Sequence, residues 1–105
     1  MTDYHRFQSL KILAYSDRLR RIAAGAWPPP NPIDWHIYAS NVCNHACAWC
    51  MFRQNGEQFD YAVKLPREVL LRAVRDAVAH DAALIHFSGG GEPLLNRHTL
   101  EAMTL

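Results

Sequence analysis

The chain has 105 residues, of which 50% are hydrophobic and 20% are charged, and its formal net charge is +1 at pH 7. This composition is typical of a globular domain with one modest core. The near-neutral charge gives no electrostatic indication of binding to nucleic acid or to an anionic membrane surface. No apolar stretch approaches the roughly 20 residues that cross a bilayer, and the first residues lack the pattern of a secretory signal. We therefore expect a cytoplasmic protein, where clustered cysteines bind metal more often than they form disulfides.

The first predicted element is a helix over residues 7–26. Its apolar residues recur at steps of three and four, which places them on one face; they are Ile12, Tyr15, Leu19, Ile22, Ala23 and Ala26. Gly25 and the run WPPPNP at residues 27–32 end the helix, because proline lacks an amide donor and fixes φ. We expect this helix to pack through its apolar face, and residues 1–32 to form a helical extension with a proline-rich connector.

Two strands with a helix between them are predicted next. Residues 33–40 alternate apolar and polar side chains, which is the period of a strand, and residues 82–88 form a short apolar run that indicates a buried strand. Residues 66–81 are predicted to be helical, with Pro66 as the first residue. The apolar face of this helix consists of Leu70, Ala73, Val74, Ala77 and Val78. A last helix is expected to begin with Asn96 or Thr99 as its cap.

The strand–helix–strand order predicts that the two strands pair in parallel. The segment CNHACAWC at residues 43–50 follows the first strand, and SGGGEP at residues 88–93 follows the second. Ligand sites in α/β folds gather at the carboxyl ends of parallel strands. We therefore expect these two segments to lie together at one ligand site.

The three cysteines of the chain, Cys43, Cys47 and Cys50, have the spacing C-x3-C-x2-C. A loop with these gaps can place three thiolates around one inorganic centre, and soft thiolates select zinc, copper(I) or iron–sulfur clusters. Clusters with complete protein ligation take four cysteines, so three cysteines would leave one iron of a four-iron cluster open to a small molecule. A Cys3His zinc site is the alternative. The histidines that could complete it are His36, His45 and His86.

Consecutive glycines in SGGGEP let the backbone adopt positive φ and approach a ligand closely, with amides free to donate. The segment is neither a phosphate loop nor a GxGxxG motif, and by itself it is better explained as a plain tight turn. Glu92 adds an acceptor beside the glycines. This combination suits the amino and carboxylate groups of an amino acid.

Taken together, CNHACAWC after the first strand and FSGGGEPLL at the end of the second strand and after it resemble the radical S-adenosylmethionine (radical SAM) superfamily. Trp49 fits the aromatic residue that this family favours before the third cysteine. The segment SNVCN at residues 40–44 resembles the sequence that leads into the motif in members that modify peptides, such as SPASM-like members, or that build cofactors. The resemblance covers residues 33–95.

This resemblance implies an α/β fold in which residues 33–105 form the first βα units of a parallel, partial TIM barrel. It implies that Cys43, Cys47 and Cys50 bind a 4Fe-4S cluster whose fourth iron is chelated by S-adenosylmethionine. It also implies that the glycine segment binds this cofactor, and that the backbone around Trp49 lies near its adenine. The residues concerned are Gly89, Gly90, Gly91, Glu92 and Pro93, with Gly90, Gly91 and Glu92 at the methionine amino group, and Trp49 near the adenine.

The activity implied is that of a radical SAM enzyme. An external flavodoxin-like or ferredoxin-like protein would reduce the cluster by one electron, and S-adenosylmethionine would be cleaved to a 5′-deoxyadenosyl radical that abstracts hydrogen from a substrate. The SNVCN segment favours a peptide as that substrate. A complete eight-unit barrel needs roughly 250 residues, so we expect a truncated chain that is inactive alone. The alternatives are a small Cys3His zinc-binding or interaction module without catalysis, and a non-catalytic remnant.

Overall fold

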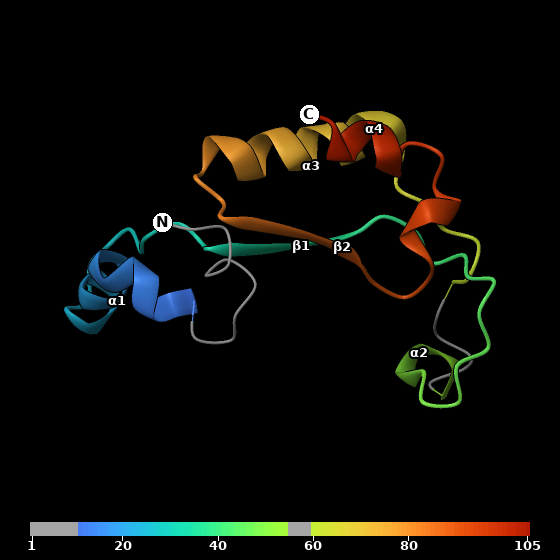
Figure 1. The fold of residues 1–105 in the computed structure, drawn as a ribbon, viewed down its shortest axis with the longest axis horizontal. Helices are drawn as coiled ribbons and strands as arrows, with labels where there is room; N and C mark the ends of the chain where they lie inside the picture. Colours follow the sequence, from blue (N-terminus) through green and yellow to red (C-terminus); the bar gives the residue numbers. More distant parts are fainter. Residues whose placement is uncertain (1–10, 55–59) are drawn as a thin grey trace.

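The computed structural model describes residues 11–54 and 60–105. A 3-10 helix over Lys11–Tyr15 leads into α1 (Ser16–Ala23), which is followed by strand β1 (Asp34–Tyr38) and the short helix α2 (Met51–Gln54) (Figure 1). The second half of the chain contains α3 (Arg67–Ala79), strand β2 (Leu84–Ser88), a 3-10 turn (Pro93–Leu95) and α4 (Thr99–Met103). The predicted order of helices and strands is confirmed, and α2 is an additional element.

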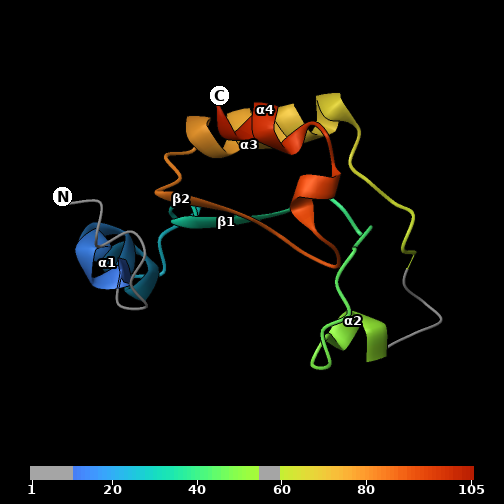
Figure 2. The same cartoon turned by 45° about the vertical axis from the view of Figure 1, so that its right-hand side comes forward.

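The two strands form a parallel sheet, as the strand–helix–strand order predicts. In its register Trp35 lies opposite Ile85, His36 opposite His86, and Ile37 opposite Phe87. Helices α3 and α4 lie on the same face of this sheet in both views (Figures 1 and 2). Because successive side chains of a strand point to opposite faces, Ile37 and Phe87 face the helices while His36 and His86 face away from them.

β1 is shorter than the predicted strand over residues 33–40, because the chain changes partner after Tyr38. Ser40 forms an antiparallel bridge with Lys64. The amide of Leu65 donates to the carbonyl of Ala39 at 3.1 Å, and the amide of Asn41 donates to the carbonyl of Val63 at 2.8 Å. The segment that leads to the cysteines is thus held by the chain before α3 and not by β2.

The core lies between the sheet and α3. Its buried members are Ile37, Ala39, Leu70, Leu71, Val74 and Ala102, with Leu65, Ala73, Ile85 and Phe87 packed against them. The predicted apolar face of α3 is correct except for Val78, which is exposed. Leu71 is buried in its place, because the helix turns a face centred between Leu70 and Val74 toward the sheet.

Asn96 or Thr99 was predicted as a helix cap. The Oδ1 atom of Asn96 accepts a hydrogen bond from the amide of His98 at 3.1 Å, in the turn that leads into α4, and its amide group has a second role. α4 begins at Thr99, with His98 at the cap position and no side-chain capping bond. The buried Asn96 amide donates to the carbonyls of Ala39 and Leu65, both at 2.9 Å. Asn96 therefore joins three segments of the chain beside the carboxyl ends of the strands.

The prediction of a long packing helix near the start of the chain is wrong for the described residues. Its first four residues, 7–10, lie outside the described range, and α1 contains no buried residue. The helix contacts the body of the protein through Arg18, whose guanidinium donates to the carbonyls of Asn31 and Pro32 at 3.0 and 3.1 Å, and to that of Asp81 at 3.1 Å. Polar contacts, not the apolar face with Leu19 and Ile22, connect α1 to the sheet. Within the described residues, no helix is both long and apolar enough to cross a membrane.

Candidate functional site

The cysteine segment and the glycine segment are in direct contact beyond the carboxyl ends of the strands. The amide of Glu92 donates to the carbonyl oxygen of Val42 at 2.9 Å. A Cβ atom on Gly91 would lie 2.3 Å from this same oxygen and 2.5 Å from the carbonyl carbon of Asn41. No side chain fits such a gap between two backbones, so glycine is required here for packing. The structure therefore brings together the two segments that the topology predicts as neighbours.

Gly89 turns the chain at the end of β2. Its φ of +126° lies in a region that residues with a side chain rarely adopt, and a Cβ atom would lie 2.7 Å from Cγ of Tyr38. The ring of Tyr38, the last residue of β1, therefore lies directly against the start of the glycine bend. Two of the three consecutive glycines are thus explained by the close packing of this bend on β1 and the chain that follows it.

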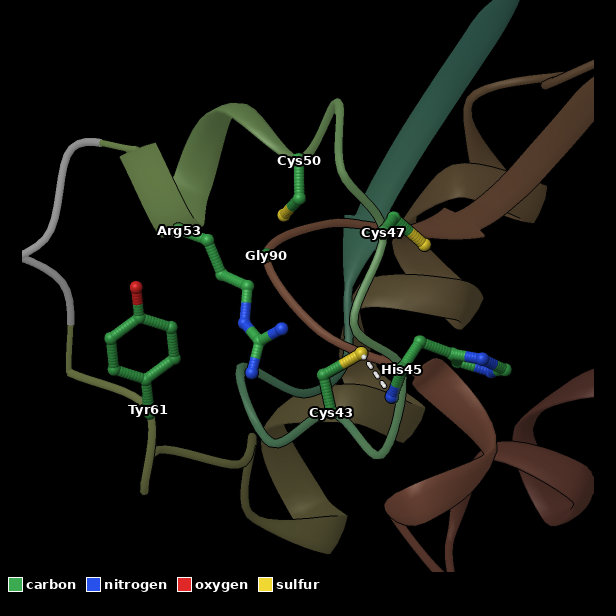
Figure 3. Close-up of a pocket in the computed structure, with 7 residues that line it drawn as sticks. All are labelled: Cys43, His45, Cys47, Cys50, Arg53, Tyr61 and Gly90. Carbon is green, nitrogen blue, oxygen red and sulfur yellow. Dashed lines mark hydrogen bonds between the residues drawn. The ribbon is translucent and has the colours of Figure 1, made fainter.

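A cavity of about 550 Å³ opens beside these segments (Figure 3). Its lining residues come from the cysteine segment, from α2 and its surroundings, and from the glycine bend: Cys43, His45, Cys47, Cys50, Arg53, Tyr61 and Gly90. All three cysteines and Gly90 were predicted as site residues from the sequence. The other predicted site residues do not line this cavity. They are Trp49, Gly89, Gly91, Glu92 and Pro93.

The three cysteines are free thiols; Cys43 and Cys47 are exposed, and Cys50 is half-buried. Their sulfur atoms do not all lie within 4.8 Å of one another. Four sulfurs around one zinc ion at 2.3 Å would be about 3.8 Å apart. Figure 3 shows the thiol of Cys50 directed toward the Gly90 bend and that of Cys47 directed away from it. This arrangement is wider than a single zinc ion requires, and it is open enough for an exposed thiol to rotate toward a larger centre.

His45 and Glu92 join the two segments through their side chains. His45 Nε2 lies 3.4 Å from Oε2 of Glu92. The other carboxylate oxygen, Oε1, accepts a hydrogen bond from the amide of Leu94 at 3.0 Å. The carboxylate of Glu92 is therefore oriented by the turn that follows it, and it faces the histidine that lies between the first two cysteines. Neither contact can be read from the spacing of the residues in the sequence.

Arg53 and Tyr61 are cavity residues that sequence reasoning missed. Arg53 lies on α2, and its guanidinium extends between Tyr61 and Cys43 (Figure 3). The hydroxyl of Tyr61 donates to the carbonyl of Phe52 at 2.9 Å, which holds its ring against α2. The position of Arg53, three residues after Cys50, was the only sequence signal that it lies at this cavity.

The backbone of the cysteine segment is held by local hydrogen bonds. The amide of His45 donates to Sγ of Cys43 at 3.4 Å, and the amide of Cys50 donates to the carbonyl of Cys47 at 3.2 Å. Before the motif, the hydroxyl of Ser40 and the backbone of Val42 exchange hydrogen bonds at 3.1 and 3.2 Å. The segment from residue 40 to residue 50 is thus held by hydrogen bonds between residues two or three apart, and it ends where α2 begins.

These features define an α/β protein that gathers thiols and a glycine bend at the carboxyl edge of parallel strands. Residues 37–104 match the family model described as the radical SAM superfamily, and this range contains both motifs. The chain belongs to the radical SAM superfamily, as its resemblance predicts.

A curated relative supports the same assignment. Over 78 residues, or 74% of this chain, it is 37% identical to the 5-amino-6-(D-ribitylamino)uracil–L-tyrosine 4-hydroxyphenyl transferase of Thermosynechococcus vestitus. The match covers 19% of that protein, so this chain spans about a fifth of its relative's length. No solved structure matches the chain.

Proposed function

We propose that this chain forms the cluster-binding and cofactor-binding part of a radical SAM enzyme, with its two strands as the first βα units of a partial TIM barrel. Cys43, Cys47 and Cys50 are the proposed ligands of a 4Fe-4S cluster. The observation that supports this most is that all three cysteines and Gly90 line one cavity at the carboxyl edge of the sheet.

The residues present fit such a cluster. Three thiols are available, none of them is in a disulfide, and each is at least partly accessible. The cavity is far larger than one metal ion, and the sulfurs are spread more widely than a single zinc ion requires. When bound, the cluster supplies an open iron for S-adenosylmethionine and the electron that cleaves it to methionine and a 5′-deoxyadenosyl radical.

We assign different tasks to the residues of the glycine segment. Gly90 borders the cavity, so its backbone is placed to contact the methionine part of S-adenosylmethionine. Gly89 and Gly91 keep the bend close to Tyr38 and to the Asn41–Val42 backbone, and Pro93 begins the turn that orients the carboxylate of Glu92. In this proposal Gly90 contacts the cofactor, whereas Gly89, Gly91 and Pro93 only maintain the shape of the bend.

Glu92 is the proposed acceptor for the methionine ammonium group. Its Oε2 atom is 3.4 Å from His45 Nε2 and is not committed to the turn, whereas Oε1 is. An ammonium group can therefore replace His45 as the partner of Oε2 without disturbing the backbone. Trp49, whose side chain is 82% exposed, is proposed to contribute only its backbone near the adenine.

The second candidate function is a Cys3His zinc module without catalysis. The observation that favours it is that His45 lines the same cavity as the three cysteines. Its fourth ligand would then be His45. Removal of the His45 side chain should therefore abolish metal binding by a zinc module but not by a cluster site.

The test is anaerobic reconstitution of the full chain with ferrous iron and sulfide. We expect a brown protein with about four irons per chain, and we expect Cys43→Ser, Cys47→Ser or Cys50→Ser each to reduce the iron content strongly. His45→Ala is the matched control in the same segment, and it should retain the iron. A colourless protein that binds one zinc ion tightly, and loses it with His45→Ala, would refute the cluster and support the zinc module.

Binding of S-adenosylmethionine tests the glycine segment separately. In the reconstituted chain, Gly90→Val should abolish calorimetric binding of the cofactor while the iron content is unchanged, because a side chain would enter the cavity. Gly25→Ala, in a turn far along the chain from the motifs, is the control and should bind normally. Equal binding by wild type and Gly90→Val would remove Gly90 from the site.

We further propose that an external flavodoxin-like or ferredoxin-like donor reduces the cluster, since the cysteine segment is exposed. The substrate has two candidates. The SNVCN segment favours a peptide, whereas the name of the relative favours a free aromatic amino acid such as L-tyrosine. Formation of 5′-deoxyadenosine in the presence of each compound would distinguish them in a protein that contains the complete barrel.

A further inference from the structure

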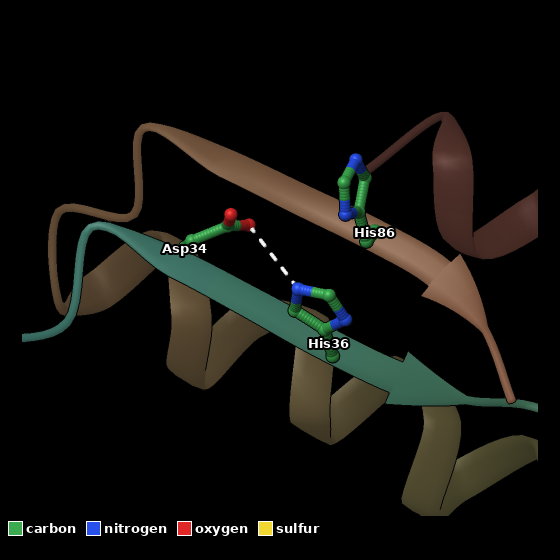
Figure 4. A group of neighbouring side chains, drawn as sticks. All are labelled: Asp34, His36 and His86. Atoms are coloured by element: carbon green, nitrogen blue, oxygen red, sulfur yellow. Dashed lines mark ion pairs between the residues drawn. The ribbon is translucent and has the colours of Figure 1, made fainter. Parts of the chain in front are cut away.

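A second group of metal-binding side chains lies apart from the cysteines, on the face of the sheet that the helices do not cover. It consists of Asp34, His36 and His86, and one ligand atom from each lies within 4.8 Å of the other two. It is the one such group of His, Cys, Asp and Glu side chains among residues 11–54 and 60–105. Figure 4 shows the three side chains on one side of the two strands, with α3 on the other.

The backbone fixes this grouping. Asp34 and His36 are two residues apart on β1, so they share a face. His86 is the register partner of His36 on β2. The imidazole rings meet edge to face, with centroids 4.9 Å apart and planes at 85°. The register of the two strands therefore brings three potential ligands together. No loop has to move to form this group.

Asp34 and His36 form an ion pair and not a hydrogen bond. Nε2 of His36 is 3.9 Å from Oδ1 of Asp34, which is too long for a hydrogen bond. The side chain of His36 is 51% exposed, whereas that of Asp34 is 22% exposed and its Oδ1 atom is buried. An ion from solvent can therefore reach the group from the side of the imidazoles. Two imidazoles and one carboxylate are a donor set that suits first-row transition metals.

We infer that Asp34, His36 and His86 bind a divalent first-row transition-metal cation of the zinc or cobalt type, with the remaining coordination positions open to water or another ligand. Zinc–nitrogen and zinc–oxygen bonds of about 2.1 Å place tetrahedral ligands about 3.4 Å apart. Rotation of the side chains closes the present separation, and the strands do not need to move. The site uses nitrogen and oxygen donors, so it is chemically distinct from the thiol site at the carboxyl edge.

This site shares no residue with the proposed cluster site, and the experiment keeps the two apart. Cobalt(II) is titrated into the full chain that carries Cys43→Ser, Cys47→Ser and Cys50→Ser, which cannot ligate a cluster. We expect one cobalt(II) per chain by calorimetry. In the same background, His36→Ala and His86→Ala should each weaken binding at least tenfold, and Asp34→Asn should weaken it severalfold.

His45→Ala is the matched control in this background and should bind cobalt(II) as tightly as its parent. Circular dichroism of every variant establishes that it is folded. A measurement that needs no histidine variant is the NMR spectrum of the imidazole rings, where zinc(II) should shift the signals of two histidines that show contacts to each other. Absence of cobalt(II) binding, binding that His86→Ala leaves intact, or binding that His45→Ala removes would each overturn the proposal. None of these results would bear on the iron content of the wild-type chain.

Discussion

Replacement of Gly91 by alanine tests the contact between the two motif segments. The added Cβ would lie 2.3 Å from the carbonyl oxygen of Val42 and 2.6 Å from that of Asn41. These neighbours are backbone atoms, so a side-chain rotation cannot relieve the overlap. The glycine bend must therefore move away from the cysteine segment, and the hydrogen bond from the Glu92 amide to Val42 is lost.

The cost can be estimated from these two effects. Overpacking of a tight contact costs about 1–3 kcal/mol, and the net loss of one hydrogen bond costs about 1 kcal/mol. We therefore expect Gly91→Ala to lower the free energy of unfolding by about 2–4 kcal/mol. A domain of this size has a total on the order of 5–15 kcal/mol, so the variant should still fold but much less stably.

Urea unfolding followed by circular dichroism measures the effect, with Gly25→Ala as the matched control. Gly25 also has a positive φ, +68°, but no heavy atom lies within 4 Å of a Cβ built there. Its replacement carries backbone strain of only about 1 kcal/mol. With a slope of about 2 kcal/mol per molar urea, Gly91→Ala should lower the midpoint by about 1–2 M. A shift no larger than that of Gly25→Ala would mean that the two segments are not in contact, and the site described above would be wrong.

Three further predictions concern the supports of the site, each measured by the same urea titration. Asn96→Ala should cost about 2–4 kcal/mol, because the carbonyls of Ala39 and Leu65 each lose one hydrogen bond in the interior. The exposed Asn31→Ala should change stability by less than about 0.5 kcal/mol. Leu70→Ala should cost about 2–5 kcal/mol, since its side chain is fully buried. The hydrogen bond and charge of Arg67 lower the pKa of Glu101 below its usual 4.5. Its charge therefore stabilises the fold above about pH 4.5, and the difference between wild type and Glu101→Gln should disappear as the pH falls through the lower folded-state pKa.

The sequence was sufficient to predict the parallel strands and the meeting of the two motifs. Both predictions depend on patterns that act over a few residues: alternation in β1, a helical face in α3, and the minimum length of a crossover connection. Once these are known, topology alone places residues 43–50 and 88–93 at one edge. The family resemblance adds chemistry to a place that the topology had already identified.

The features that sequence reasoning missed depend on contacts between segments that are far apart in the chain. The side chains of His45 and Glu92 are in contact, and Tyr61 lines the cavity, because of how the segments pack. No periodicity encodes such pairs. The error at α1 has a related cause. Leu19 and Ile22 form an apolar face of helical spacing, but a face is buried only when another element covers it, and within the described residues Arg18 makes the contacts instead.

The parallel sheet explains why chemistry gathers in two places that do not overlap. The loops that follow the two strands begin at the carboxyl edge of the sheet, and there the cysteine segment and the glycine bend meet. The same strand delivers every second side chain to each face, and α3 and α4 cover only one face. Polar residues on the covered face would have to be desolvated, so Asp34, His36 and His86 can occur together only on the open one. A single register between β1 and β2 therefore determines both sites. A slip of β2 by one residue would turn His86 to the face that the helices cover and separate it from Asp34 and His36, which stay together on β1.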